Sequence, residues 1–95
     1  MSKITLVITA KIPIKGVPAF QKYEDLVLPL LPQYGGVLEQ RLRNDDGTLE
    51  VHIISFDSQS SFDDYRNSPE RAKHSHIMEK AKAVIELEYM YDVKR

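Results

Sequence analysis

The pattern that indicates the fold most clearly lies between Val37 and Phe56, where the sequence reads VLEQRLR (37–43), NDDG (44–47) and TLEVHIISF (48–56). Both outer segments alternate polar and apolar side chains with a period of two, which is typical of strands that bury one face. The middle segment consists of residues that tight turns favour. The stretch therefore predicts two antiparallel strands joined by a four-residue turn.

The charges of this hairpin indicate how its strands pair. If Arg41 stands opposite Glu50, then Glu39 stands opposite His52, and groups of complementary charge face one another. The same register collects the apolar side chains of both strands on the other face. A slip of one residue would move every side chain to the wrong face, so the pattern favours this pairing.

Before the hairpin, the sequence predicts a strand and a helix. Ile4–Ile12 alternates with a period of two and is expected to be a strand. An amphipathic helix is expected from Pro18, interrupted by Pro29 and Pro32 and ended by Gly35-Gly36. Its polar side is expected to carry Gln21, Lys22, Glu24 and Asp25.

After the hairpin, Asp57 or Ser58 is expected to cap a second helix. This helix breaks at Pro69 and restarts through about Ala81, and Val84–Val93 follows as an alternating strand. The order strand, helix, strand, strand, helix, strand predicts an α+β, ferredoxin-like fold: a four-stranded antiparallel sheet with helices on one face. A chain of 95 residues is too short to divide, so residues 1–95 are expected to form a single domain.

Side-chain alternation assigns each strand residue to one of two sheet faces. The face under the helices is expected to hold Ile4, Leu6, Ile8, Leu38, Leu42, Leu49, Val51, Ile53, Ile85, Leu87 and Tyr89. The uncovered face is expected to hold Thr5, Val7, Thr9, Glu39, Arg41, Arg43, Glu50, His52, Ile54, Glu86, Glu88 and Met90. Small domains bury only roughly 60 to 65% of their unfolded surface, so we expect a second copy of the chain to cover this face.

The composition excludes several classes of function. Thirteen Lys and Arg against fourteen Asp and Glu leave a net charge of −1. This charge gives no overall electrostatic attraction to nucleic acid or to an anionic membrane surface. The absence of cysteine removes disulfides, thiolate nucleophiles and cysteine-based metal sites, and it suits a reducing compartment. No apolar run approaches the ~20 residues of a membrane helix, so we expect a cytoplasmic protein without a membrane partner.

The titratable groups of the expected uncovered face form the candidate site. An imidazole beside a carboxylate can act as a general base near neutral pH, and His52 has Glu39 opposite it in this register. Arg41 beside Glu50 offers a planar cation that can stabilise negative charge on a substrate oxygen. The alternative is that these groups form only cross-strand ion pairs at a dimer interface. The residues expected to contact a ligand are Glu39, Glu50, Thr9 and Glu88.

No metal site is expected. His74 and His76 are two residues apart on a predicted helix or turn, so they lack the four-residue spacing by which a helix offers two imidazoles to one metal. The sequence also has no phosphate-binding loop, dinucleotide fingerprint or nucleophile elbow. Any chemistry must come from the histidine, arginine, tyrosine and carboxylate side chains.

Three features resemble the dimeric α/β-barrel superfamily: a proline-bearing helix ending in Tyr34-Gly35-Gly36, a strand ending in Ser55-Phe56, and a helix closing on Ser68-Pro69-Glu70. The resemblance covers nearly the whole chain, and the nearest relatives are small members of unknown function related to cofactor-free monooxygenases of antibiotic biosynthesis. It implies a homodimer in which two sheets pack face to face. The superfamily also includes muconolactone isomerases, haem-binding members and stress-associated proteins; no cofactor is expected here.

Two functions remain open at this point. The first is a cofactor-independent enzyme, monooxygenase-like or isomerase-like, that acts on a small organic metabolite in a pocket on the uncovered sheet face. In that enzyme His52 is the base and Arg41 stabilises developing negative charge. The second is a non-catalytic dimeric module, ligand-binding or stress-associated, in which the polar face serves as the dimer interface.

Overall fold

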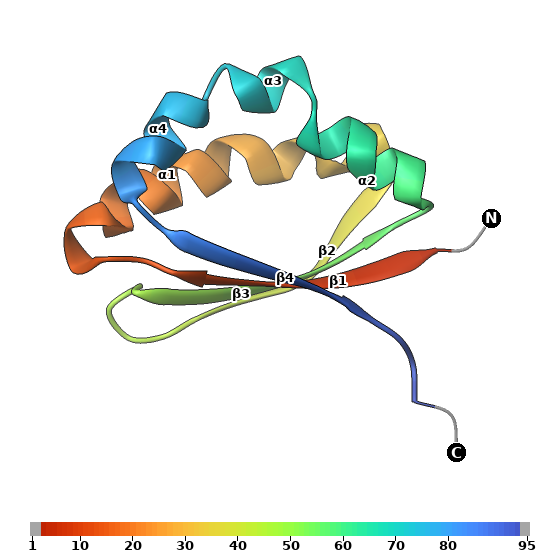
Figure 1. Cartoon of the computed structure of the whole chain (residues 1–95), viewed down its shortest axis with the longest axis horizontal. Coiled ribbons are helices and arrows are strands. Elements are labelled where there is room, and N and C mark those ends of the chain that lie inside the picture. The colour runs from red at the N-terminus through yellow and green to blue at the C-terminus, as the bar shows by residue number, and fades with distance from the viewer. Residues whose placement is uncertain (1–2, 94–95) are drawn as a thin grey trace.

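A computed structural model describes residues 3–93 of the chain. Its four strands form one antiparallel sheet in the order β2-β3-β1-β4, and the helices cross one face of that sheet (Figure 1). The expected α+β, ferredoxin-like arrangement is confirmed. The strands are β1 (Ile4–Lys11), β2 (Gly36–Arg43), β3 (Leu49–Phe56) and β4 (Val84–Met90).

The first connection between strands changes its helical geometry along its length. Pro18 lies in the first turn of the α-helix, where a missing amide donor costs nothing. Pro29 and Pro32 fall in the following segment, which tightens into 3₁₀ turns. Gly35 ends the helical stretch at a φ of 71°, a left-handed conformation that glycine adopts without steric cost. The elements are η1 (Ile14–Gly16), α1 (Val17–Val27) and η2 (Leu28–Tyr34).

The second connection contains three short helices, where the sequence predicted two. The Oγ of Ser58 accepts a hydrogen bond from the Ser61 amide at 3.2 Å and caps the first of them. Ser68 caps the next in the same way, immediately before Pro69. No helix within residues 3–93 is long and apolar enough to cross a membrane. The three are α2 (Gln59–Arg66), α3 (Pro69–Ala72) and α4 (Ser75–Ala81).

The apolar core lies between the sheet and the helices. One cluster joins Leu6 and Ile54 of the sheet to side chains of η2 and α2. A second joins Ala10 of β1 to Phe20 of α1 and Ala81 of α4. These clusters identify the covered face of the sheet.

The predicted faces are correct for β1, β4, Leu38 and Glu39, but they are wrong for the rest of the hairpin. Leu6 pairs with Ile54 and Ile8 pairs with His52, so residues 50, 52 and 54 of β3 point towards the helices. Leu49, Val51 and Ile53 of β3 occupy the uncovered face instead. The prediction placed Leu42, Leu49, Val51 and Ile53 in the core and Arg41, Arg43, Glu50, His52 and Ile54 outside it; the structure reverses both sets.

The hairpin register also differs from the prediction, by two residues. Arg43 pairs with Glu50 and Arg41 pairs with His52. A bulge between Leu38 and Gln40 leaves Glu39 unpaired in the ladder and directs it to the uncovered face, where it accepts a hydrogen bond from Ser55. This register lets both arginines reach the carboxylate of Glu50, so its charge can be buried.

The uncovered face of the sheet is the broad open side of a thin molecule. The shortest principal extent is 17 Å, which is the thickness of two layers. Apolar side chains are exposed on this face, and Val37 and Leu42 of β2 retain 52% and 49% of their accessible surface. The face is therefore more apolar than the sequence predicted.

Candidate functional site

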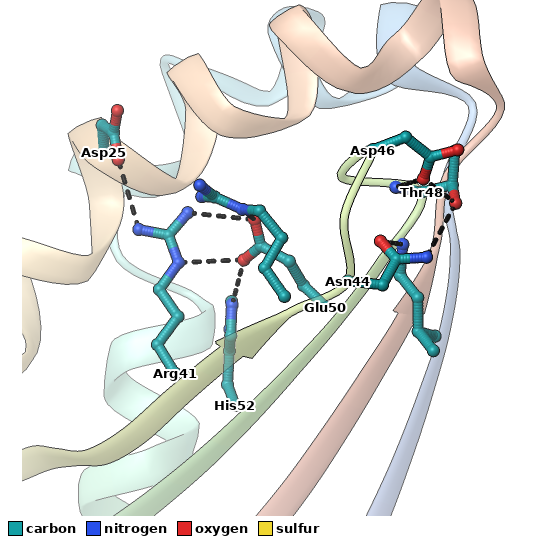
Figure 2. A network of polar contacts seen from close by, with 9 residues as sticks. Asp25, Arg41, Asn44, Asp46, Thr48, Glu50 and His52 are labelled. Carbon is teal, nitrogen blue, oxygen red and sulfur yellow. Dashed lines mark hydrogen bonds and ion pairs between the residues drawn. The ribbon is translucent and has the colours of Figure 1, made fainter.

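The covered face of the sheet carries a buried ionic cluster centred on Glu50. Arg41 donates from Nε to Glu50 Oε1 at 2.9 Å and from Nη2 to Oε2 at 3.4 Å. Arg43 Nε donates to the same Oε2 at 2.7 Å. Figure 2 shows Arg41 between Glu50 and Asp25 of α1, whose Oδ1 lies 3.2 Å from Arg41 Nη1. The guanidinium groups thus fix the Glu50 carboxylate from two sides.

Glu50 is ionised despite having no exposed surface. Burial alone would raise its pKa, but the hydrogen bonds from Arg41, His52 and Arg43 outweigh burial and lower the pKa to about 2. The carboxylate is therefore a pure hydrogen-bond acceptor at neutral pH. Both of its oxygens are already engaged, so Glu50 serves as an internal anchor.

This anchor determines the protonation of His52. The imidazole is 3% exposed, and its Nε2 lies 2.8 Å from Glu50 Oε1. Because that oxygen can only accept, Nε2 carries the proton. Burial lowers the pKa of His52, and this outweighs the opposing effect of Glu50, so the ring is neutral at pH 7. Within residues 3–93, Nδ1 has no hydrogen-bond partner and keeps a free lone pair.

A cavity of about 180 Å³ lies beside His52, between the sheet and the helices. An apolar cavity of about 150 Å³ is large enough for a benzene ring, so this space fits a small organic molecule. Aliphatic side chains of β1 and β4 form its floor, and aromatic side chains of α1 and α2 form its walls. The apolar lining consists of Ile8, Ala10, Phe20, Leu28, Ile54, Phe62, Met78, Ile85 and Leu87.

Polar groups from the helices also border the cavity. Glu24 of α1 is only 8% exposed, and burial raises its pKa to about 7 even though Arg71 and Arg41 oppose that rise. Tyr65 of α2 donates to the backbone oxygen of Val27 at 3.1 Å, and burial raises its pKa, so its hydroxyl stays protonated. Arg71 of α3 completes this polar side.

The structure brings together only part of the predicted site. His52, Arg41 and Glu50 meet, but on the covered face and not on the uncovered one. Arg41 lies behind Glu50, outside the cavity lining. Glu39 faces away, and Thr9 and Glu88 lie on the uncovered face, so a pocket combining all six residues does not form.

Sequence reasoning missed Glu24. Glu24 was expected on the polar side of the helix, yet it follows Phe20 by four residues and precedes Val27 by three, which places it within the apolar stripe. That spacing was a usable signal. The positions of Arg66 and Arg71 on either side of Pro69 indicated a pocket mouth, although solvated helix ends carry such residues routinely, and both residues line the cavity. Among residues 3–93, no three His, Cys, Asp or Glu side chains gather closely enough to hold a metal ion.

Comparison with known proteins finds likeness in structure alone. No protein-family profile matches the chain, and no curated protein matches it in sequence. The fold matches Rv0793 from Mycobacterium tuberculosis with a TM-score of 0.77 at 14% identity, over 99% of this chain and 98% of that one. A candidate antibiotic biosynthesis monooxygenase from Caulobacter crescentus also gives 0.77, at 17% identity, over 97% and 91%.

A third similar structure is SnoaB from Streptomyces nogalater, described as a cofactor-independent oxygenase. It matches with a TM-score of 0.70 at 15% identity, over 100% of this chain and 97% of that one. The chain has the ferredoxin-like fold of the antibiotic biosynthesis monooxygenases. The resemblance stated from the sequence is thereby confirmed at the level of the fold. Identities this low carry no activity from one chain to another.

Proposed function

We propose that the protein is a cofactor-independent enzyme that removes a proton from a small, mainly apolar metabolite, with His52 as the general base. The observation that carries this proposal is the fixed imidazole beside the cavity. Glu50 holds the proton on Nε2, so Nδ1 is the free, basic nitrogen of a neutral ring. A neutral imidazole in an apolar cavity is suited to accept a proton from carbon or oxygen.

The environment also accommodates the product of that step. When Nδ1 takes the proton, the ring becomes an imidazolium whose Nε2–H points at the ionised Glu50, and the pair of opposite charges stabilises it. The substrate keeps the electron pair of the broken bond, which is stable when a neighbouring carbonyl spreads it as an enolate. We therefore infer a substrate with an acidic hydrogen next to a carbonyl group.

Two reactions follow from such an enolate. When a C=C bond extends the enolate, return of the proton to the far carbon of that bond gives an isomerase, and transfer of electrons from the enolate to dioxygen begins a monooxygenase reaction. The likeness in fold to SnoaB, which is described as a cofactor-independent oxygenase, supports the second. Arg41 takes a different role from the predicted one: it holds Glu50 and does not touch the substrate.

We also propose that the protein works as a homodimer joined through the uncovered sheet face. Four strands about 4.8 Å apart and about eight residues long form a sheet whose flat area is roughly 500 Å². The side chains that protrude from the sheet increase its accessible surface. Stable interfaces bury about 800 Å² on each partner, which a corrugated face of this size approaches. Because the cavity lies on the other side of the sheet, each subunit would hold its own.

The catalytic proposal is tested with 2-tetralone, a neutral bicyclic ketone with acidic C–H bonds beside its carbonyl. Binding is first established by NMR shift titration, and exchange of those hydrogens is then followed in D₂O. We expect the protein to accelerate exchange and His52→Asn to reduce the acceleration about 100-fold, as loss of a general base does. His76→Asn, which changes an exposed histidine of α4, is the matched control.

Exchange that persists in His52→Asn would exclude His52 as the base. Saturable binding without accelerated exchange in the unaltered protein would favour the non-catalytic, ligand-binding alternative.

A further inference from the structure

Arg71 has one buried hydrogen-bond donor without an acceptor, although its guanidinium also interacts with the side chains of Tyr23 and Tyr65. Its Nε is buried and is the single buried side-chain nitrogen or oxygen without a partner in residues 3–93. The guanidinium carbon lies 4.8 Å from the ring centre of Tyr65 and 5.9 Å from that of Tyr23, so two aromatic faces fix its plane. Nη1 donates only a long bond, 3.4 Å, to the backbone oxygen of Arg66. A buried donor without an acceptor is costly and calls for an explanation.

Glu24 is another polar group on the same cavity. The residue is 8% exposed, and within the described part of the chain its side chain makes no hydrogen bond or ion pair. Glu24 and Arg71 both border the cavity, and the charge of Arg71 acts on Glu24 by favouring its ionised form. A guanidinium and a carboxyl group therefore border a space that a ligand can enter.

We propose that the cavity binds a small aromatic or cyclic carboxylic acid, with its carboxylate on the guanidinium of Arg71 and next to the carboxyl group of Glu24. A carboxylate presents the acceptor that Arg71 lacks, and its geometry matches the planar guanidinium fork. The apolar lining takes the ring. This inference rests on the proposed function, because it assigns the substrate class of the same cavity.

The surroundings favour an anion over a cation at this point. Arg71 is one free positive charge, whereas the charge of Glu50 is already neutralised by Arg41 and Arg43. A ligand ammonium would meet Arg71 at close range, and only the partly ionised carboxyl of Glu24 would offset that repulsion.

Binding of the acid is coupled to the protonation of Glu24. The charged groups that act on Glu24 are Arg71 of α3, Arg41 of β2, Glu50 of β3 and its neighbour Asp25. His52 is neutral at pH 7. As the pH rises through about 7, Glu24 ionises and repels the ligand carboxylate. A ligand that requires the protonated form therefore binds about tenfold more weakly at pH 8 than at pH 6.

The experiment compares benzoate with benzamide, which has the same shape without the charge. The protein is titrated with each at pH 6 and pH 8, and backbone amide NMR shifts give the dissociation constants. We expect benzoate to bind at least tenfold more tightly than benzamide at pH 6, and this preference to disappear in Arg71→Met. Lys73→Met, which removes an exposed charge two residues away, is expected to keep it.

Two further variants guard against indirect effects. Arg71→Lys keeps the charge but loses the planar fork, and we expect it to retain part of the preference. Glu24→Gln keeps a donor but cannot ionise, so its benzoate affinity is expected to be the same at pH 6 and pH 8. Equal affinity for benzoate and benzamide, an unchanged preference in Arg71→Met, or a tenfold pH effect that survives in Glu24→Gln would each overturn the proposal.

The result is separable from that of the catalytic proposal. 2-Tetralone has no carboxylate, so its exchange tests His52 whether or not the acid preference is found.

Discussion

Glu50 shows how a single charged residue can lie inside a small domain. An isolated buried carboxylate would take up a proton, because the loss of hydration disfavours its charge. Here two guanidinium groups and one imidazole N–H surround both oxygens at 2.7–3.4 Å. Arg41 and Arg43 keep part of their own surface in solvent, so they lose less hydration than Glu50 does. The cluster is stable only as a set, and removal of one member exposes the others to the full cost of burial.

Glu50→Gln is therefore expected to lower the free energy of unfolding at neutral pH. The pKa of Glu50 is about 2 in the folded chain against 4.5 ordinarily. A lowered pKa stabilises the fold above pH 4.5, and the stabilisation is lost as the pH falls towards 2. At about 1.4 kcal/mol for each pKa unit, the contribution is about 3 kcal/mol. Urea unfolding at pH 7 and at pH 2.5 measures it.

The difference between the unaltered protein and Glu50→Gln is expected to shrink at pH 2.5, because this pH lies well below the ordinary pKa of 4.5 and close to the folded-state pKa of about 2. Glu79→Gln, which changes an exposed glutamate of α4, controls for the general effect of acid. A constant difference across this range would mean that the stabilisation comes from packing and not from the charge of Glu50.

At the scale of elements, the sequence was sufficient to predict every strand, the first helix and the sheet topology. Alternation marked β1 and β4, Gly35 marked the end of the first connection, and Asn44 to Gly47 marked the turn. These signals are local, because each depends on the conformational preference of a few neighbouring residues.

The relative placement of the hairpin and β1 is not local, and here prediction failed. β3 has apolar residues on both faces, so its own alternation does not say which face meets the helices. Charges were assigned to the open side because the predicted register collected apolar side chains on the other face, yet the cluster of Glu50 makes burial of its charge tolerable. The bulge at Glu39 also uncouples the two halves of β2. His52 was correctly singled out, but the cavity beside it was not predicted.

The contact between η1 and α4 depends on a residue without a side chain. A β-carbon at Gly16 would lie 2.0 Å from the backbone oxygen of Ala81, far closer than atoms can approach. The φ of Gly16 is −91°, which any residue adopts, so the requirement is for space and not for backbone freedom. The backbone of α4 cannot yield as a flexible side chain would.

Gly16→Ala is accordingly expected to lower the free energy of unfolding by about 1–3 kcal/mol, the usual cost of overpacking. The neighbouring exposed substitution Lys15→Ala is expected to change it by less than about 0.5 kcal/mol. Chemical denaturation of both variants at pH 7 makes the comparison. A Gly16→Ala protein as stable as the Lys15→Ala protein would show that η1 and α4 are free to move apart.

The whole molecule is a two-layer structure with its two faces used differently. The face under the helices holds a polar cluster and a cavity, while the uncovered face carries exposed aliphatic side chains. This division reverses the sequence-based picture, in which polar groups were to lie between two subunits. Dimerisation through the uncovered face is therefore expected to depend on apolar contact, and Arg41, on the other side of the sheet, does not contribute to it.

Ile53→Lys provides the test of that dimer. Ile53 lies on β3, an interior strand, and pairs with Val7 and Gln40, so its side chain stands in the middle of the uncovered face. A lysine there would have to be desolvated against its symmetry mate, and we expect the dissociation constant to rise at least 100-fold. Leu26→Lys places the same change on an exposed position of α1 and is expected to leave the dimer intact.

Sedimentation velocity over a range of concentrations measures the dimerisation of all three proteins, and circular dichroism checks their folding. A monomer in the unaltered protein would contradict the proposed dimer. A dimer that persists in folded Ile53→Lys would place the contact elsewhere, because a lysine at the centre of two packed sheets has no path to water.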